Sequence, residues 1–459
     1  MPPGSLLNGL RRLAPGQVLI LYYTVAILIG SALLSLPMAS SGEPLPFIDA
    51  LFTATSAQCV TGLTVVDTGS GLSIFGQLVV LCLIQLGGLG ITTFSVYLFF
   101  FLRLGVGAQG RWIINETLLH TPVHSLRELI SSIILISIGI EAAGTAILAF
   151  VFVPDLGLSR GLFAAAFHSI SAFCNAGFSL FTDSLIGYRG NVTVNLTVMG
   201  LITLGGIGFL VIREIMDIVL DRESTKRSRL SLHSRIVLWT SGLLVLGGAL
   251  LILIMEVNGA FAGLSTVEKI LTASFQSVTA RTAGFNTIDM NTLRVSTLLL
   301  MVFLMFVGAS PGSAGGGIKT TSLALFIAIF HSRLKGNPHT NIFRRTISTE
   351  TVTKTLALVM LAALVVGAAL FSLILVQHPG ASAGLHDDVF LKYFFETVSA
   401  FGTVGLSVGA TNLLNTGGKV IIIVLMFLGR VGLLTVAFTI AKRLSPNATR
   451  YAEENIMIG

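Results

Sequence analysis

Charged side chains are scarce in this chain. They make up 11% of its 459 residues, while hydrophobic residues make up 53% and the mean hydropathy is +0.88. A soluble domain carries about a quarter charged residues, so the composition excludes an ordinary soluble protein. About 20 apolar residues suffice for a helix to cross a membrane, and the sequence holds long apolar runs such as Val18–Leu36, Leu78–Phe101, Ile236–Met255 and Val420–Ala441. We therefore predict an all-α polytopic membrane protein.

Cysteine and catalytic clusters are scarce as well. The three cysteines, Cys59, Cys82 and Cys174, lie in apolar stretches without metal-ligand spacing, so we expect small buried residues and no disulfide framework or zinc site. A membrane-embedded enzyme would need paired acids, a histidine-rich site or a nucleophile with its base. Glu141 and Glu256 are isolated acids, which we expect neighbours to satisfy. The sequence predicts neither catalytic residues nor a bound cofactor.

Two stretches resemble nucleotide-binding motifs, but neither follows the strand that such a motif requires. Gly312–Thr320 is close to a P-loop, but Ile318 intrudes before the lysine and no strand precedes it. Residues 105–110 match GxGxxG, yet they follow a predicted spanning helix instead of a strand. We expect any nucleotide to bind a partner.

The net charge of +7 is unevenly distributed. Basic residues gather in the tails and in alternate loops, in five separated segments. This asymmetry predicts cytoplasmic termini at both ends and an even number of crossings. A nucleic-acid surface is the alternative, and the wide separation of the basic segments disfavours it, so no nucleic-acid partner is predicted.

Internal repetition dominates the rest of the sequence. Four segments share aromatic and small residues followed by a glycine: Phe52–Asp67, Phe167–Phe181, Phe275–Asp289 and Phe395–Gly409. Aligning their glycines also aligns Ser56, Ser171 and Ser399, and pairs Cys59 with Cys174. Four such matches at near-even intervals indicate one structural unit used four times.

The flanks of each segment repeat too. Long apolar runs precede them: Val18–Leu36, Leu129–Val153, Ile236–Val257 and Thr355–Val376. Apolar runs with central glycines follow: Gly87-Gly88, Gly205-Gly206, Gly308 and Gly429. Between them, stretches such as Phe47–Gln58 and Leu162–Phe173 are too short to span a membrane, as in a re-entrant segment. We predict four tandem helix–pore loop–helix repeats with eight crossings around a pseudo-fourfold pore. The predicted bounds are 1–110, 111–220, 221–335 and 336–459, the last with a cytoplasmic tail.

The loops themselves predict an ion pathway. Irregular backbone at membrane depth must be buried or line a watery cavity, and glycine allows neighbouring carbonyl groups to turn toward an axis. Rings of carbonyl oxygens conduct potassium, and the C-terminal ends of short helices favour a cation. The predicted filter comprises Val60, Thr61, Gly62, Asn175, Ala176, Gly177, Thr282, Ala283, Gly284, Thr403, Val404 and Gly405. Close helix packing at small residues is the alternative.

These patterns resemble a known superfamily. The loops VTGL, NAGF, TAGF and TVGL, with the string RTAGF, resemble those of the Trk/Ktr/HKT cation transporters. Eight predicted crossings and the ending EENIMIG are most similar to the membrane subunits of Ktr potassium uptake systems. The resemblance implies a homodimer in the cell membrane, seated on a cytoplasmic ring of nucleotide-binding KtrA-type subunits. It also implies sodium-stimulated potassium uptake, with Gly62 favouring potassium, since serine at that position goes with sodium passage.

The third run after a motif is interrupted by residues 308–322. Pro311 removes a backbone donor, and glycines surround it: Gly308, Gly312, Gly315, Gly316 and Gly317. A static kink is one interpretation. The other is a loop at 308–317 that blocks the pore, and the resemblance implies an intramembrane gate here.

Basic residues at membrane depth are costly and mark functional sites. Arg430 is expected to hydrogen-bond the carbonyl groups of the gating loop and hold it closed, or to repel cations. Lys319 is expected to act similarly or to reach the cytoplasmic surface. Arg281 is expected to support the third loop, with Glu396 or Asp49 as its partner.

Alternative functions remain open at this point. One is a sodium-conducting or weakly selective cation transporter. Another is a secondary carrier for a different solute, although carriers with inverted repeats differ from the parallel repeats predicted here.

Overall fold

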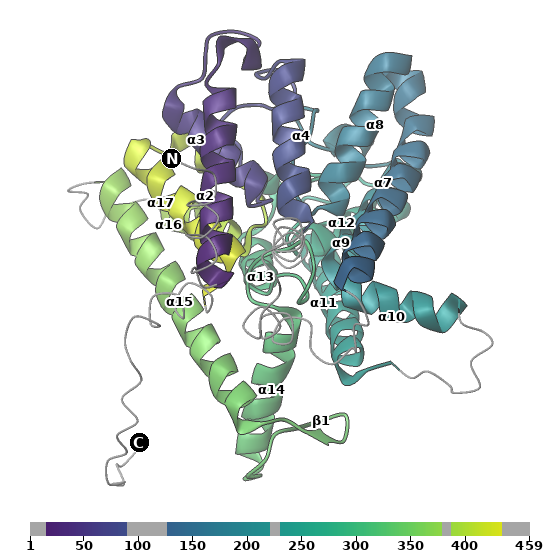
Figure 1. The fold of residues 1–459 in the computed structure, drawn as a ribbon, viewed down its shortest axis with the longest axis vertical. Helices are drawn as coiled ribbons and strands as arrows, with labels where there is room; N and C mark the ends of the chain where they lie inside the picture. The colour runs from purple at the N-terminus through teal and green to yellow at the C-terminus, as the bar shows by residue number, and fades with distance from the viewer. Residues whose placement is uncertain (1–14, 90–125, 221–229, 379–386, 434–459) are drawn as a thin grey trace, which may run out of the picture.

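The computed structural model describes residues 15–89, 126–220, 230–378 and 387–433, which form a helical protein (Figure 1). The GxGxxG match at 105–110, the ending EENIMIG and both basic tails lie outside these residues. The described chain divides into four stretches in which a long helix, a short helix, a loop and another helix follow in the same order. We call these stretches units 1 to 4.

The first helix of each unit is long. These helices are α2 (Pro15–Leu34), α7 (Leu126–Leu156), α11 (Leu232–Glu256) and α15 (Thr349–Gln377), and all four are long and apolar enough to cross a membrane. Their outer faces expose large apolar side chains, among them Ile29, Phe150, Leu246 and Phe371, because lipid and not water surrounds such a helix. A helix lies at each of the four predicted first runs. Helices α7 and α15 extend beyond the predicted run at both ends, whereas α2 and α11 begin earlier and end one or two residues before it.

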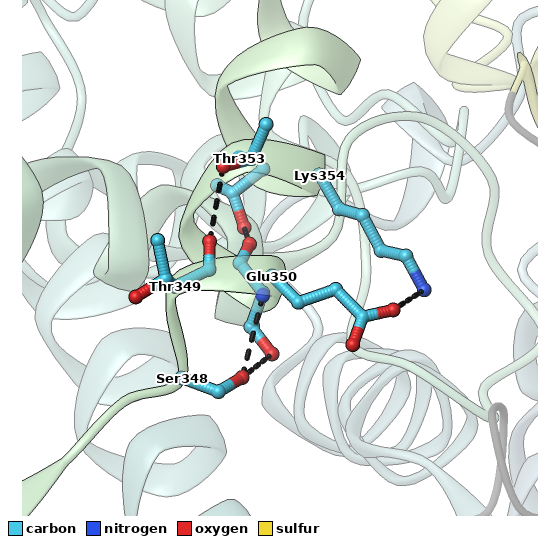
Figure 2. A network of polar contacts seen from close by, with 7 residues as sticks. Ser348, Thr349, Glu350, Thr353 and Lys354 are labelled. Carbon is cyan, nitrogen blue, oxygen red and sulfur yellow. Dashed lines mark hydrogen bonds and ion pairs between the residues drawn. The ribbon is translucent and has the colours of Figure 1, made fainter. Parts of the chain in front are cut away.

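Helix α15 shows how a spanning helix begins. The Ser348 Oγ accepts a hydrogen bond from the Thr351 N–H at 3.4 Å and so caps the helix (Figure 2). Glu350 lies in the first turn, where it suits the helix dipole, and pairs with Lys354 at 2.9 Å. Just before α15, strands β1 (Asn341–Ile342) and β2 (Arg345–Thr346) form a small antiparallel hairpin after α14 (Thr320–Leu334). This polar end contrasts with the apolar body of the helix.

A short helix follows each long one and packs against it. These are α3 (Phe47–Gln58), α8 (Leu158–Phe173), α12 (Thr266–Thr279) and α16 (Asp387–Gly402). The predicted bounds of α3 are confirmed at both ends, and those of α8 at its C-terminus. Each short helix ends within one of the four repeated segments.

The helices after the motifs are α4 (Ile74–Gly88), α9 (Val192–Ile207), α13 (Val295–Phe306) and α17 (Thr416–Val431). The ends of the predicted runs Leu78–Phe101 and Val420–Ala441 lie outside the described residues. Asparagine or serine side chains cap α4, α9 and α17 at Ser73, Asn191 and Asn415. Short 3₁₀ turns occur at Pro37–Ala39, Ile186–Tyr188, Met290–Thr292 and Thr411–Leu413.

The interruption predicted in unit 3 lies between α13 and α14, and the structure has breaks in other units as well. Helix α9 breaks at Gly208, where φ is +99°, and α10 (Phe209–Leu220) leaves at an angle of 102° (Figure 1). Helix α17 ends at Gly432, where φ is +90°. Hydropathy does not register these breaks because glycine allows a left-handed backbone without interrupting the apolar run.

Buried apolar side chains form two clusters. One is drawn mostly from units 3 and 4, and the other mostly from units 1 and 2. Phe52 and Leu63 of unit 1 belong to the former, whereas Ala283 and Phe285 of unit 3 belong to the latter. The clusters therefore meet at the motifs.

Cys59 and Cys174 are buried as expected, but Cys82 is exposed and lines an apolar groove of about 670 Å³ between α2 and α4.

Candidate functional site

Four loops share one unusual backbone shape. We call residues 60–62, 175–177, 282–284 and 403–405 the motif loops. Their first residues have φ of +56° at Val60, +59° at Asn175, +66° at Thr282 and +51° at Thr403. Their last residues, all glycines, have φ of +91°, +71°, +78° and +92°. Such angles are uncommon outside glycine and persist where surrounding structure imposes them, so the repetition is a property of the fold and not of one loop.

Each of the four motif glycines lies against the motif loop of the next unit, so the contacts form a closed ring. A Cβ atom on Gly62 would come within 3.0 Å of the Ala176 carbonyl oxygen. The same holds for Gly177 with Ala283, for Gly284 with Val404 and for Gly405 with Thr61. Unit 1 thus contacts unit 2, unit 2 contacts unit 3, unit 3 contacts unit 4 and unit 4 contacts unit 1. Backbone approaches this close leave no room for a side chain at any of the four glycines.

Hydroxyl groups of the short helices anchor the loops. The Ser56 Oγ accepts from the Gly62 N–H at 3.1 Å, and the Ser399 Oγ accepts from the Gly405 N–H at 3.1 Å. The Ser171 hydroxyl instead donates to the Phe178 carbonyl oxygen at 2.8 Å. Unit 3 has Val278 at the aligned position, and there the Thr279 hydroxyl donates to the Phe285 carbonyl oxygen at 2.6 Å. The third loop is therefore held differently.

Glycines of the following helices pack against the ends of the short helices. A Cβ atom on Gly87, Gly205 or Gly429 would come within 3.0 Å of a carbonyl oxygen of Gln58, Phe173 or Phe401, respectively. In unit 3 the aligned glycine, Gly308, lies equally close to the Gly316 carbonyl oxygen instead.

Residues 307–319, which we call the inserted segment, separate α13 from α14. Val307 and Ile318 pair as a parallel bridge across its base. The segment fills the break between α9 and α10. The Ser310 N–H donates to the Gly206 carbonyl oxygen at 3.0 Å, and the Phe209 N–H donates to the Gly312 carbonyl oxygen at 3.1 Å. Backbone groups that the broken helix leaves free are thus satisfied by the segment of the next unit.

The tip of the inserted segment contacts two motif loops. The Gly316 N–H donates to the Thr403 Oγ1 at 3.0 Å. A Cβ atom on Gly315 would come within 3.0 Å of the Thr282 Oγ1. The predicted gate residues and the predicted filter residues are therefore in direct contact.

Arg430 lies beside this segment and is 5% exposed. Its guanidinium donates to the carbonyl oxygens of Ala314 and Gly87, and its Nε donates to the Tyr23 hydroxyl at 3.3 Å. The Lys319 Nζ donates to the Gly315 carbonyl oxygen at 2.7 Å, from a half-buried position. Buried cations require such partners, and here carbonyl groups of the inserted segment supply them.

The partners expected for Arg281 were wrong. Its Nη2 donates to the Ser241 Oγ at 3.0 Å. Asp49 pairs with Lys419, and Glu396 accepts hydrogen bonds from Ser407 and Thr411. The spacing of apolar residues carries no information on such pairings.

The two isolated acids are satisfied by neighbours, as expected. The Gln85 Nε2 donates to both carboxylate oxygens of Glu141 at 3.1 Å. Glu256 accepts from the backbone N–H groups of Ala260 at 3.0 Å and Arg294 at 2.9 Å.

Sequence reasoning missed Tyr23, the Gly87 carbonyl group and the joint at Gly208. The sequence does carry a signal for the helix break at Gly208. In units 2 and 4 a second glycine, Gly208 or Gly432, lies three residues after the glycine that packs against the short helix. Unit 3 has Pro311 at the same position.

The long apolar helices and the broken helices around the four contacting loops define a multi-pass, α-helical membrane protein. The chain matches the TrkH family, described as cation transport protein, over residues 14–451, and it belongs to that family. This family comprises membrane cation transporters and not enzymes.

Relatives cover nearly the whole chain. The Ktr system potassium uptake protein B of Bacillus subtilis is 40% identical over 450 residues, covering 98% of this chain and 97% of its own. The potassium/sodium uptake protein NtpJ of Enterococcus hirae is 37% identical, covering 98% of each chain. The crystal structure of the potassium transporter TrkH from Vibrio parahaemolyticus shares the fold, with a TM-score of 0.71 at 22% identity over 95% of this chain and 85% of that one.

Proposed function

We propose that this protein takes up potassium through a pore at the centre of the four motif loops. The observation that carries the proposal is the closed order of glycine–carbonyl contacts through all four units. In this arrangement the units are tandem pore repeats, the short helices are re-entrant, and eight crossings surround a pseudo-fourfold axis. The uptake activities named for the relatives from B. subtilis and E. hirae support it.

The filter is formed by the carbonyl groups of the motif loops. Left-handed backbone at both ends of each loop turns successive carbonyl groups in a pattern that ordinary strands or helices lack. Carbonyl oxygens around an axis replace the hydration shell of potassium, and the C-terminal ends of α3, α8, α12 and α16 favour a cation there.

The inserted segment is the gate in this proposal. Its tip lies against Thr282 and Thr403 of the filter loops, and Arg430 and Lys319 hold its carbonyl groups. Backbone contacts to unit 2 and the side chains of Arg430 and Lys319 hold the segment, so we propose a movable plug in preference to a static kink.

The names of the relatives support a proposal for the assembly and regulation of this protein. The name of the B. subtilis relative denotes a system with more than one component. We propose a homodimer in the cell membrane with cytoplasmic termini, controlled by a KtrA-type ring that binds the nucleotide. Sodium is the proposed activator, and the name of the E. hirae relative makes sodium transport the second candidate function.

The test is potassium and sodium flux into proteoliposomes that contain the purified protein. Gly62→Ser is the key variant, because a side chain there meets the Ala176 carbonyl group on a backbone with φ of +91°. We expect potassium preference in the wild type and a several-fold loss of that preference in the variant. Gly263→Ser is the matched control, since Gly263 also has positive φ but a Cβ atom added there would meet no described atom within 4 Å.

Equal flux of both ions in the wild type would support the second candidate function. Uptake of neither cation, even after deletion of the gate, would contradict the pore and favour a carrier for another solute.

A further inference from the structure

Two short helices carry an ionisable side chain at aligned positions near their middles. His168 of α8 and Glu396 of α16 are both fully buried, at 0% exposure. Neither belongs to the filter or to the gate. Each nevertheless reaches a serine that follows a motif glycine by two positions, Ser179 in unit 2 and Ser407 in unit 4.

The contacts of His168 fix the tautomer of its neutral ring. Its Nδ1 lies 2.7 Å from the Ala164 carbonyl oxygen, which can only accept, so Nδ1 carries the proton. In the neutral ring Nε2 then accepts from the Ser179 hydroxyl at 2.9 Å. The Ser179 Oγ in turn accepts from the Phe181 N–H at 2.9 Å. The ring stacks on Phe181 at 4.5 Å, which further restricts its orientation.

Glu396 makes the corresponding contacts in unit 4. Its Oε2 accepts from the Ser407 hydroxyl at 2.8 Å, and its Oε1 accepts from the Thr411 hydroxyl. The Ser407 Oγ accepts from the Gly409 N–H at 3.0 Å, as Ser179 does from Phe181. Different side chains thus produce the same chain of hydrogen bonds from the short helix to the backbone beyond the loop. We call each of these chains a brace.

Units 1 and 3 lack the brace at the aligned positions. Unit 1 has Thr53, whose buried Oγ1 has no hydrogen-bond partner among the described residues. Unit 3 has Phe275, which has no polar side-chain atom. Because the glycine contacts run from unit 1 through units 2, 3 and 4 and back, the braced units lie opposite each other in the ring.

We infer that His168 and Glu396 are positioning residues that set how well the pore distinguishes potassium from sodium. This inference rests on the proposed function. Each acts through its serine, which fixes the chain just beyond the filter glycine. In a filter that selects by the size of its cavity, ion discrimination depends on how firmly the coordinating groups are held. The two braced loops lie opposite each other and fix one diameter of the ring, while the loops of units 1 and 3 are anchored by Ser56 and Thr279 without this brace.

The experiment compares potassium and sodium uptake into proteoliposomes for Ser179→Ala and Ser407→Ala. We expect the ratio of sodium to potassium uptake to rise about fivefold in each, the effect of losing one hydrogen bond of ordinary strength. Potassium uptake itself should change little. A merely structural defect would lower uptake of both ions together and leave the ratio unchanged.

Matched variants separate the brace from general damage. Thr53→Val removes an unpartnered hydroxyl from the aligned position of an unbraced unit, and its ratio should equal that of the wild type. Ser179→Thr and Ser407→Thr keep the hydroxyl and should retain more discrimination than the alanine variants. His168→Gln keeps a polar group within reach of Ser179 and should discriminate better than His168→Leu.

The outcomes distinguish this inference from the proposed function. A protein that takes up no potassium, even after deletion of the gate, overturns the proposed function. A wild type that prefers potassium, with both alanine variants showing the same ratio, overturns the braces alone. The same follows if Thr53→Val shifts the ratio as much as Ser407→Ala.

Discussion

In units 1, 2 and 4 the helix after each motif loop places a glycine against the end of its own short helix, whereas unit 3 does not. There Gly308 lies against Gly316 of the inserted segment. Unit 3 also lacks the serine that anchors the other loops and uses Thr279 instead. The unit that departs most from the common pattern is the one that carries the proposed gate.

The comparison shows how a plug can be held without a core of its own. The break at Gly208 in unit 2 leaves backbone groups that residues 310 and 312 of the inserted segment satisfy. Arg430 of unit 4 and Lys319 satisfy its carbonyl groups. A segment held by polar contacts to its neighbours can exchange those contacts for water or ions, which a packed apolar segment cannot do.

The largest expected effect comes from deleting part of the inserted segment, the feature that distinguishes unit 3 from the other units. Deletion of residues 311–316 removes the contacts to Thr403, Thr282 and α10. If the gate is closed about 99% of the time, potassium flux should rise up to about a hundredfold. Flux into proteoliposomes measures this without a partner protein.

The deletion needs a check on selectivity. Gly62→Ser in the deleted background should still reduce potassium preference, because the filter remains. A deleted protein that inserts normally but conducts no faster than wild type would show that the segment is not the gate.

A smaller effect is expected from Arg430→Ala. The change leaves the carbonyl groups of Ala314 and Gly87 without their charged donor. Hydrogen bonds to charged groups contribute about 1.5–3 kcal/mol, so the open fraction should rise about ten- to a hundredfold. Potassium flux into proteoliposomes, without a partner protein, measures this change in the open fraction.

Tyr23→Phe is the control for Arg430→Ala, since it removes only the 3.3 Å contact at Nε and leaves both carbonyl contacts in place. It should change flux by less than the alanine variant. Unchanged flux in Arg430→Ala would mean that the arginine neither holds the segment closed nor repels cations in the pathway.

Much of the fold could be predicted from the sequence, because hydrophobic runs and aligned motifs report burial and repetition directly. The ends of α3 and the four loops with positive φ fall where the motifs predict them. The break at Gly208 could not be predicted from hydropathy, since apolar residues continue on both sides of it. The partners of Arg281 depend on side-chain distances between units, which no periodicity encodes. The braces at His168 and Glu396 were missed for the same reason.

The smallest effect tests the contact between the gate and the filter in unit 4. Thr403→Val keeps the shape of the side chain but removes the oxygen that accepts from the Gly316 N–H at 3.0 Å. A neutral hydrogen bond contributes about 0.5–1.5 kcal/mol, so flux without a partner should rise about two- to tenfold. Thr403→Ser keeps the oxygen and should behave as wild type in the same assay. If serine and valine raised flux equally, the methyl group would be responsible and the segment would rest on packing. A valine variant that alone conducts faster would show that one hydroxyl joins the segment of unit 3 to the filter of unit 4, a contact without a counterpart among the described residues of the other units.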